Sequence, residues 1–119
     1  MKTKMPPRKE KNKLRKTNRK IIITGKQAIK ALQEIGFMFI SLRQMEDYYF
    51  YKEIEAPGQD PGTRAREISR FVTQNNFINR LAVVRKTISE RFDNSLGNDD
   101  MSDSERAMEH LTFWEKLGD

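Results

Sequence analysis

Residues 37–56, FMFISLRQMEDYYFYKEIEA, fit two different structures, and the fold class of the chain depends on which of them forms. In a β-hairpin, the alternate apolar residues from Met38 to Leu42 would face one way, and Gln44 to Asp47 would make the turn. The aromatic run from Tyr48 to Tyr51 has a high strand propensity, which favours this hairpin.

A continuous helix over residues 37–55 is the alternative. It would have to run through Gly36, and it would place Arg43 and Glu46 on its apolar stripe. We therefore predict the hairpin and keep the helix as the second possibility.

The segment just before this stretch predicts a short strand and a helix. Ile21 to Ile23 are β-branched, which is typical of a strand. Thr24 and Gln27 have the spacing of a capping box, so a helix should begin at Gly25. Gly36 followed by Phe37 predicts that this helix stops after Ile35.

The order of helix, Gly36-Phe37 and hairpin over residues 25–52 loosely resembles the helix and wing of winged-helix proteins, or the front of small double-stranded-RNA-binding-like folds. The resemblance covers under a third of the chain and includes no specific motif. The helix–turn–helix that opens a winged helix is missing, so no site residues are carried over from it.

The second half of the chain has a helical pattern. Residues 57–62, PGQDPG, form the clearest break, with Asp60 as a helix cap and Pro61 at the first helical position. Apolar residues then recur at helical spacing from Pro61 to Phe92, which predicts one long helix. Two helices broken near Gln74-Asn75-Asn76 are the alternative.

A C-terminal helix is predicted after a polar loop. Ser102 and Glu105 have capping-box spacing. The helix should pack on the long helix through an apolar stripe, formed by Ala107, Met108, Leu111, Trp114 and Leu117.

Together these elements predict an α+β fold of arm, short strand, helix, β-hairpin, long helix and C-terminal helix, with an all-α helical bundle as the alternative. Residues 1–20 should be a disordered basic arm, since they contain almost no apolar residues. Residues 21–119 should be a single small globular domain with a hinge-like loop at residues 56–62.

Positive charge is concentrated at the start of the chain. Residues 1–26 hold 11 of the 23 Lys and Arg residues but only one of the 17 acids, Glu10. This part has a net charge of +10 and the remainder a net charge of −4, which the overall +6 conceals.

A polybasic arm is suited to phosphate contacts, which release counterions and steepen the salt dependence of binding. A solubilising tail and a contact with anionic lipid are the alternatives. The arm has neither aromatic residues nor an amphipathic pattern, which argues against lipid. The predicted long helix adds a second basic surface that could contact phosphate, or pair with acids of the last helix. The predicted nucleic-acid-binding residues are Lys9, Lys11, Lys13, Arg15, Lys16, Arg19, Lys20, Arg66, Arg70 and Arg80.

No constellation of residues predicts an enzyme, a metal site or a cofactor. His110 is the only histidine and has no nucleophile beside it in the sequence, and there is no cysteine. No apolar run is long enough to span a bilayer, and no apolar segment follows the charged N-terminus as in a secretory signal, so we expect a cytoplasmic or nucleoid protein.

We expect a non-enzymatic, homodimeric accessory or regulatory protein that binds DNA or RNA. The alternative is a protein-interaction module, an adaptor or inhibitor, that docks through its aromatic and acidic surfaces.

Overall fold

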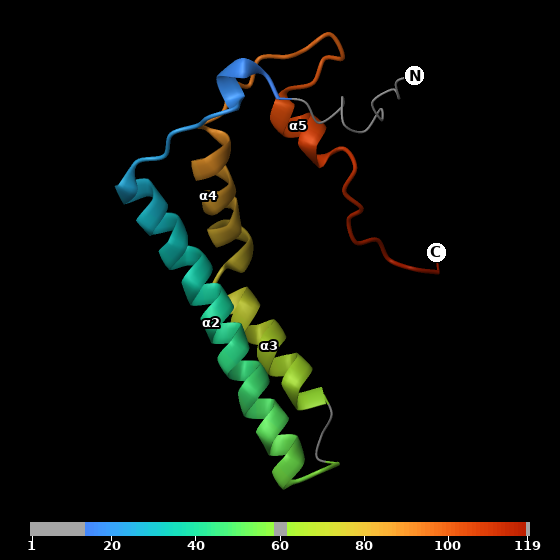
Figure 1. Cartoon of the computed structure of the whole chain (residues 1–119). Helices are drawn as coiled ribbons and strands as arrows, with labels where there is room; N and C mark the ends of the chain where they lie inside the picture. The colour runs from blue at the N-terminus through green and yellow to red at the C-terminus, as the bar shows by residue number, and fades with distance from the viewer. Residues whose placement is uncertain (1–13, 59–61, 119) are drawn as a thin grey trace, which may run out of the picture. The chain divides into compact units, whose positions relative to one another are not determined.

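The computed structural model describes residues 14–58 and 62–118. They form a short 3-10 helix and four α-helices, namely η1 (Lys16–Asn18), α2 (Gly25–Glu55), α3 (Gly62–Gln74), α4 (Phe77–Ser89) and α5 (Asp103–Met108) (Figure 1). No strand occurs in these two ranges, so the predicted α+β class is wrong and the all-α alternative fits. None of the described helices is both long and apolar enough to cross a membrane.

The chain divides into two compact units. The helical unit comprises residues 23–88, and the terminal unit comprises residues 1–22 together with residues 89–119. Most of the predicted disordered arm, residues 1–13, lies outside the described residues, as do Asp60 and Pro61 with their predicted capping roles. The disorder of the arm stays a prediction for residues 1–13, whereas its described part, residues 14–20, includes η1 and the buried Asn18. The single domain over residues 21–119 stays a prediction.

Helix α2 begins at the predicted capping box, which is confirmed. The Thr24 hydroxyl accepts a hydrogen bond from the Gln27 backbone N–H at 3.1 Å, and the Gln27 side chain accepts one from the Thr24 N–H at 3.3 Å. The helix then runs through Gly36, where the sequence predicts a stop, and ends at Glu55. A glycine inside a helix costs only about 1 kcal/mol relative to alanine. The packing and hydrogen bonds of the following turns outweigh that cost.

Residues 37–55 are helical because their inward residues recur at helical spacing. Met38, Leu42, Met45 and Tyr49 lie four, three and four residues apart, and each is buried or half-buried. A strand would divide these four side chains between its two faces. The hairpin prediction is therefore wrong and its helical alternative is right. The strand predicted at residues 21–23 is wrong too, since the described chain offers it no partner strand.

Helices α3 and α4 run antiparallel to α2 within the helical unit (Figure 1). Arg64 of α3 pairs with Glu46 near the end of α2, with an Nη2–Oε2 distance of 2.6 Å. Arg80 of α4 pairs with Glu34 near the start of α2, with an Nη1–Oε1 distance of 2.8 Å. The two ion pairs fix the same antiparallel register at two levels.

An aromatic cluster joins the three helices. Phe37, Phe71 and Phe77 contribute one ring each, with centroids 5.6–6.4 Å apart. The Arg80 guanidinium lies 4.4 Å from the Phe37 ring centre, a cation–π contact. Phe77 is the most buried ring of the cluster, with only 6% of it exposed.

The predicted single helix over residues 61–92 is wrong, and the alternative of two helices is right. Asn76 has a φ of 52°, a left-handed conformation that asparagine tolerates better than most residues. The Asn75 side chain donates to the Phe71 carbonyl at 3.0 Å, and Arg80 Nε donates to the Asn75 carbonyl at 2.8 Å. These two hydrogen bonds satisfy backbone carbonyls at the end of α3 and stabilise the turn between α3 and α4.

The terminal unit is built around Asn18, which is 3% exposed. Its amide nitrogen donates to the Asp93 carbonyl at 3.0 Å and to Asp103 Oδ2 at 2.8 Å, and its amide oxygen accepts from the Asp93 N–H at 2.6 Å. The Arg15 backbone N–H also donates to Asp103 Oδ2, at 2.8 Å. One asparagine therefore ties the chain before α2 to the chain after α4.

Helix α5 starts at the predicted capping box, with Ser102 accepting from the Glu105 N–H at 3.2 Å, so this cap is confirmed. The helix ends at Met108, however, and does not continue to Leu117 as predicted. Residues 111–114 are leucine, threonine and two aromatic residues. They have no surface to pack on in the described part of the chain, and Trp114 is 85% exposed. A helix of six residues does not propagate without such packing.

Candidate nucleic-acid interface

The basic residues in and just after η1 form one exposed part of the predicted interface. Lys16, Arg19 and Lys20 are exposed, and none of them forms an ion pair with a residue in the described ranges. Arg15 differs, because it is half-buried and its Nε lies 3.9 Å from Asp103 Oδ1. The other predicted arm residues, Lys9, Lys11 and Lys13, lie outside the described residues.

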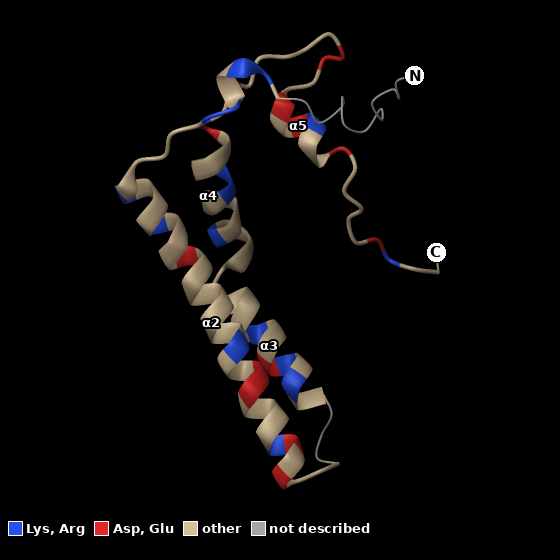
Figure 2. Ribbon diagram, in the orientation of Figure 1, with Lys and Arg blue, Asp and Glu red and all other residues tan. Residues whose placement is uncertain are grey.

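The Asn18 anchor determines how these cations are presented. Residues 16–18 form a tight turn in which the Asn18 N–H donates to the Arg15 carbonyl at 2.9 Å. The Arg19 N–H donates to the Lys16 carbonyl at 3.2 Å. Because the buried Asn18 faces inward, Lys16, Arg19 and Lys20 are left on the outside of the turn. Figure 2 shows this basic segment in blue, immediately after the part drawn in grey.

The arginines predicted on the helices are engaged within the protein. Arg80 is half-buried between Glu34, the Asn75 carbonyl and the Phe37 ring, so a phosphate would have to compete with these three contacts. Arg70 pairs with Glu67 in the preceding turn of α3, with an Nη1–Oε2 distance of 2.6 Å.

Arg66 and Arg70 share a face of α3. That face lines a shallow open hollow together with small and polar residues, namely Ala65, Ser69, Thr73 and Gln74. The Arg66 Nη2 donates to Thr63 Oγ1 at 3.3 Å. The structure thus groups two of the three predicted helical arginines and places Arg80 in a different environment.

The aromatic run of α2 does not form one stacking surface. Tyr48 and Tyr49 contact each other edge to face, with centroids 4.9 Å apart, and Phe50 and Tyr51 do the same at 5.4 Å. Tyr49 points inward, and burial, followed by the nearby Glu67 carboxylate, raises the pKa of its hydroxyl. Acidic residues interrupt the second half of α2, as Figure 2 shows in red.

The carboxylates of the terminal unit are held in their charged form. Hydrogen bonds from Ser95 and then Thr17 lower the pKa of Asp93 to about 2. Hydrogen bonds from the Asn18 side chain and the Arg15 N–H lower the pKa of Asp103. Asp93 and Asp103 therefore make internal contacts, whereas Lys16, Arg19 and Lys20 of the same unit are exposed.

Arg106 organises the loop before α5. Its guanidinium donates to both carboxylate oxygens of Asp99 at 2.9 Å, to Asp103 Oδ1 at 2.8 Å and to the Met101 carbonyl at 2.9 Å. The same contacts lower the pKa of Asp99 and raise the pKa of Arg106. A Cβ at Gly97 would lie 2.9 Å from Arg106 Nη2, so a side chain there would displace the end of the guanidinium.

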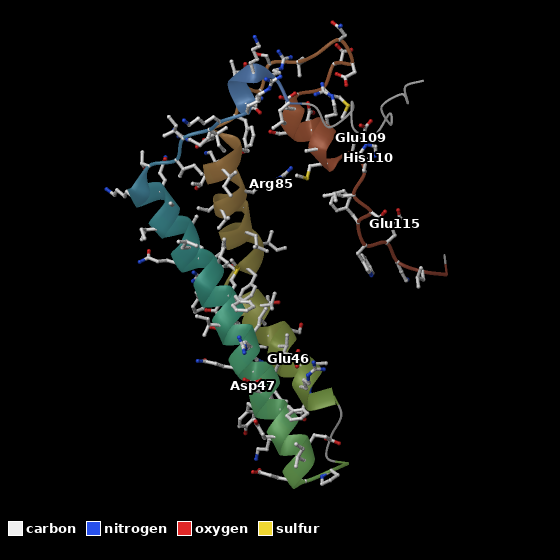
Figure 3. All side chains as sticks on the ribbon, viewed as in Figure 1. Glu46, Asp47, Arg85, Glu109, His110 and Glu115 are labelled. Carbon is white, nitrogen blue, oxygen red and sulfur yellow. The ribbon has the colours of Figure 1, made fainter. Side chains whose placement is uncertain are left out.

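The structure adds no catalytic or metal-binding constellation within the described ranges. Asp99 and Asp103 both bind Arg106 and share its guanidinium as their counter-ion. No group of three or more His, Cys, Asp or Glu side chains in the described part could hold a metal ion. His110 is exposed and follows the end of α5, with Glu109 and Glu115 in the same C-terminal segment (Figure 3).

Sequence reasoning missed Asn18 and Asp93 as the residues that position the basic turn. Their contacts join residues 75 positions apart, and no periodic pattern in the sequence indicates them. Of the residues in this network, only Asp103 could be placed from the sequence, because the Ser102 and Glu105 capping box puts it in the first turn of α5. Known protein families, curated proteins and solved structures were all compared with this chain, and none of them matches it.

Proposed function

We propose that this chain is a non-enzymatic accessory or regulatory protein of the cytoplasm that binds nucleic acid through its N-terminal basic segment. One observation carries the proposal. Lys16, Arg19 and Lys20 are exposed and free of ion pairs with described residues, whereas Arg70 and Arg80 each pair with an acid. Phosphate contacts by these lysines and arginines would supply affinity without reading a sequence.

The basic segment continues into the first turns of α2. Lys26 and Lys30 are exposed, and neither forms an ion pair with a described residue. Together with the eight Lys and Arg residues of positions 1–16, they make one continuous basic stretch along the chain. Two of the three helical arginines contribute less, since their charges are already partly neutralised.

Salt-dependent binding of the full chain tests this proposal. The probes are a duplex DNA and a single-stranded RNA of equal length, and the variants are R19Q/K20Q and, as a matched control, R66Q/R70Q. Each phosphate contact contributes about 0.9 to the slope of log K against log salt for duplex DNA. We expect R19Q/K20Q to reduce that slope by up to about 2, with a much smaller change for R66Q/R70Q.

Two outcomes contradict the proposal. One is that R66Q/R70Q weakens binding as much as R19Q/K20Q, which would assign the contact to α3. The other is that the unmodified chain shows no salt-dependent binding to either probe at low salt.

A protein-interaction module is the second candidate, and a specific observation favours it. Helix α2 exposes large apolar side chains on the face that points away from α3 and α4. A contiguous set of exposed large apolar side chains is typical of a protein-interaction site.

A further inference from the structure

Helix α2 has two apolar faces, and its own unit covers only one of them. The inner face carries Met38, Leu42, Met45 and Tyr49 toward α3 and α4. The outer face is a second stripe of large apolar side chains, each more than half exposed. Its members are Ile29, Leu32, Phe39, Ile40, Phe50, Tyr51 and Ile54.

The outer stripe has the spacing of a helix–helix seam. Positions 36, 40, 43, 47, 50 and 54 alternate steps of four and three residues, which is the heptad pattern of a coiled coil. Four of these six positions are Gly36, Ile40, Phe50 and Ile54. The two in the middle are Arg43 and Asp47, one helical turn apart.

The charges of Arg43 and Asp47 indicate what kind of partner would cover this face. Both are exposed, and neither forms a hydrogen bond or ion pair with a residue in the described ranges. Glu46, by contrast, lies on the α3 side of α2, while Asp47 lies away from it (Figure 3). A purely apolar partner would bury both charges without compensation, which is costly. A partner must therefore offer an acid opposite Arg43 and a base opposite Asp47.

We propose that a second copy of this chain docks antiparallel on the outer face of α2, about a two-fold axis level with Met45. This axis brings Arg43 of each copy opposite Asp47 of the other, so one ion pair forms twice. A two-fold interface repeats each contact in this way. Parallel pairing would instead place Arg43 against Arg43 and Asp47 against Asp47.

The same axis matches the apolar residues by size. Ile40 of one copy lies level with Phe50 of the other, and Phe39 lies level with Tyr51. Gly36 lies level with Ile54, and nothing lies within 4 Å of the place where a Gly36 side chain would begin. The glycine therefore leaves room for a large residue of the second copy.

The exposed aromatic rings alone supply a large share of the area that a stable pair needs. A fully buried aromatic side chain covers roughly 150–250 Å², and Phe39, Phe50 and Tyr51 are about three-fifths exposed. Six such rings from two copies would remove roughly 600 Å² from water. That is about half of the ~1,200 Å² of a small specific interface, and the isoleucines and charged stems of the stripe add to it.

A charge swap in the full-length chain tests both the partner and the register. Arg43→Asp and Asp47→Arg each place like charges together at the axis, and we expect either change to weaken the dimer at least about tenfold. The double variant R43D/D47R restores opposite charges and should return the dissociation constant to within a few fold of the unmodified chain. Lys30→Asp, on an exposed side of α2 away from the stripe, is the matched control and should leave it unchanged. Sedimentation equilibrium gives the dissociation constants, and circular dichroism shows that helix content is kept.

Spin labels provide a test of direction that does not depend on affinity. The sequence has no cysteine, so a label can be placed at a single engineered position. With the axis at Met45, labels at Glu55→Cys should be about 30 Å apart along the helix pair, since each residue rises about 1.5 Å. Labels at Gln44→Cys should be close together.

Three results would overturn the proposal. The first is a chain that stays monomeric at all concentrations, which would leave this face to a different partner. The second is a double swap that fails to restore the dimer. The third is a short distance between labels at Glu55→Cys, which indicates parallel pairing. Because none of these measurements involves nucleic acid, they are independent of the proposed function.

Discussion

The helical unit and the terminal unit are held together by opposite kinds of interaction. In the helical unit the buried side chains are apolar, namely Met38, Phe77 and Val84. In the terminal unit the buried side chains are polar, namely Asn18, Ser102 and Asp103. Apolar contacts are graded and add up over area, whereas a buried hydrogen-bond network depends on every member. A truncation in the helical unit should therefore reduce stability in proportion to the apolar area removed, whereas a truncation in the terminal unit should disrupt the hydrogen-bond network of that unit as a whole.

Truncation in the aromatic cluster should give the largest effect. Phe77→Ala removes the most buried ring from the contact between Phe37 and Phe71. It should lower the free energy of unfolding by about 3–5 kcal/mol, measured by chemical denaturation at one fixed protein concentration. Trp114→Ala removes a larger side chain that is 85% exposed and should change stability by less than about 0.5 kcal/mol. Equal losses for the two variants would show that the cluster is not the core.

Loss of the Asn18 anchor should be smaller and confined to the terminal unit. Asn18→Ala leaves the Asp93 N–H without its acceptor and removes a donor to the buried Asp103 carboxylate. The expected cost is about 2 kcal/mol of local stability. Faster hydrogen exchange at the backbone N–H groups of Arg15 and Asp93 would measure it.

Asn98→Ala, an exposed change in the same unit, is the matched control and should leave both exchange rates as they are. If Asn18→Ala also accelerates exchange at Met38 in α2, the two units open together, and the effect is not confined to the terminal unit as predicted.

These two effects also show how far sequence reasoning reaches. The caps at Thr24 and Ser102 were predictable because each is a contact over three residues. The inner face of α2 was not, since Gly36 and the aromatic run locally favour a turn and strands, and the helix is selected by packing on α3 and α4. The Asn18 contact with Asp103 spans 85 residues, and only the folded chain brings the two together.

The candidate interface likewise has one part that the sequence predicts and another that only the fold determines. The exposure of Lys16, Arg19 and Lys20 could be expected from their charges alone, because unpaired cations remain in contact with water. The engagement of Arg80 by Glu34 and Phe37 could not be predicted, since it requires the antiparallel register of α4 on α2. A count of basic residues on a helix therefore overstates the cations available to phosphate.

The break between α3 and α4 offers a test of intermediate size. Asn76→Ala puts a residue that disfavours the left-handed region at a φ of 52° and should cost about 1 kcal/mol. Asn76→Gly should be close to neutral, because glycine reaches this conformation freely but is more flexible when unfolded. Thermal unfolding of both variants measures the difference. If the alanine variant is the more stable one, the two helices join into one in solution.

Acid should act on the terminal unit first and provides the smallest and most local change. The pKa of Asp93 is about 2 in the folded chain, mainly through hydrogen bonds from Ser95 and Thr17, against about 3.9 for a free aspartate. A lowered pKa means that the stabilisation is complete above about pH 4 and is lost as the pH falls toward 2. Asp103, whose pKa is also lowered, changes in the same direction.

Nuclear magnetic resonance of the Asn18 side-chain amide should follow this loss, with constant signals from pH 7 to about 4 and a change below that. Asp93→Asn removes one titrating carboxylate and should make the change smaller. The rings of Phe37, Phe71 and Phe77 contact one another without a carboxylate between them, so their signals should move later in the titration. A simultaneous change in both sets of signals would mean that the polar anchor and the apolar cluster unfold as one, and the contrast between the units would then be one of composition alone.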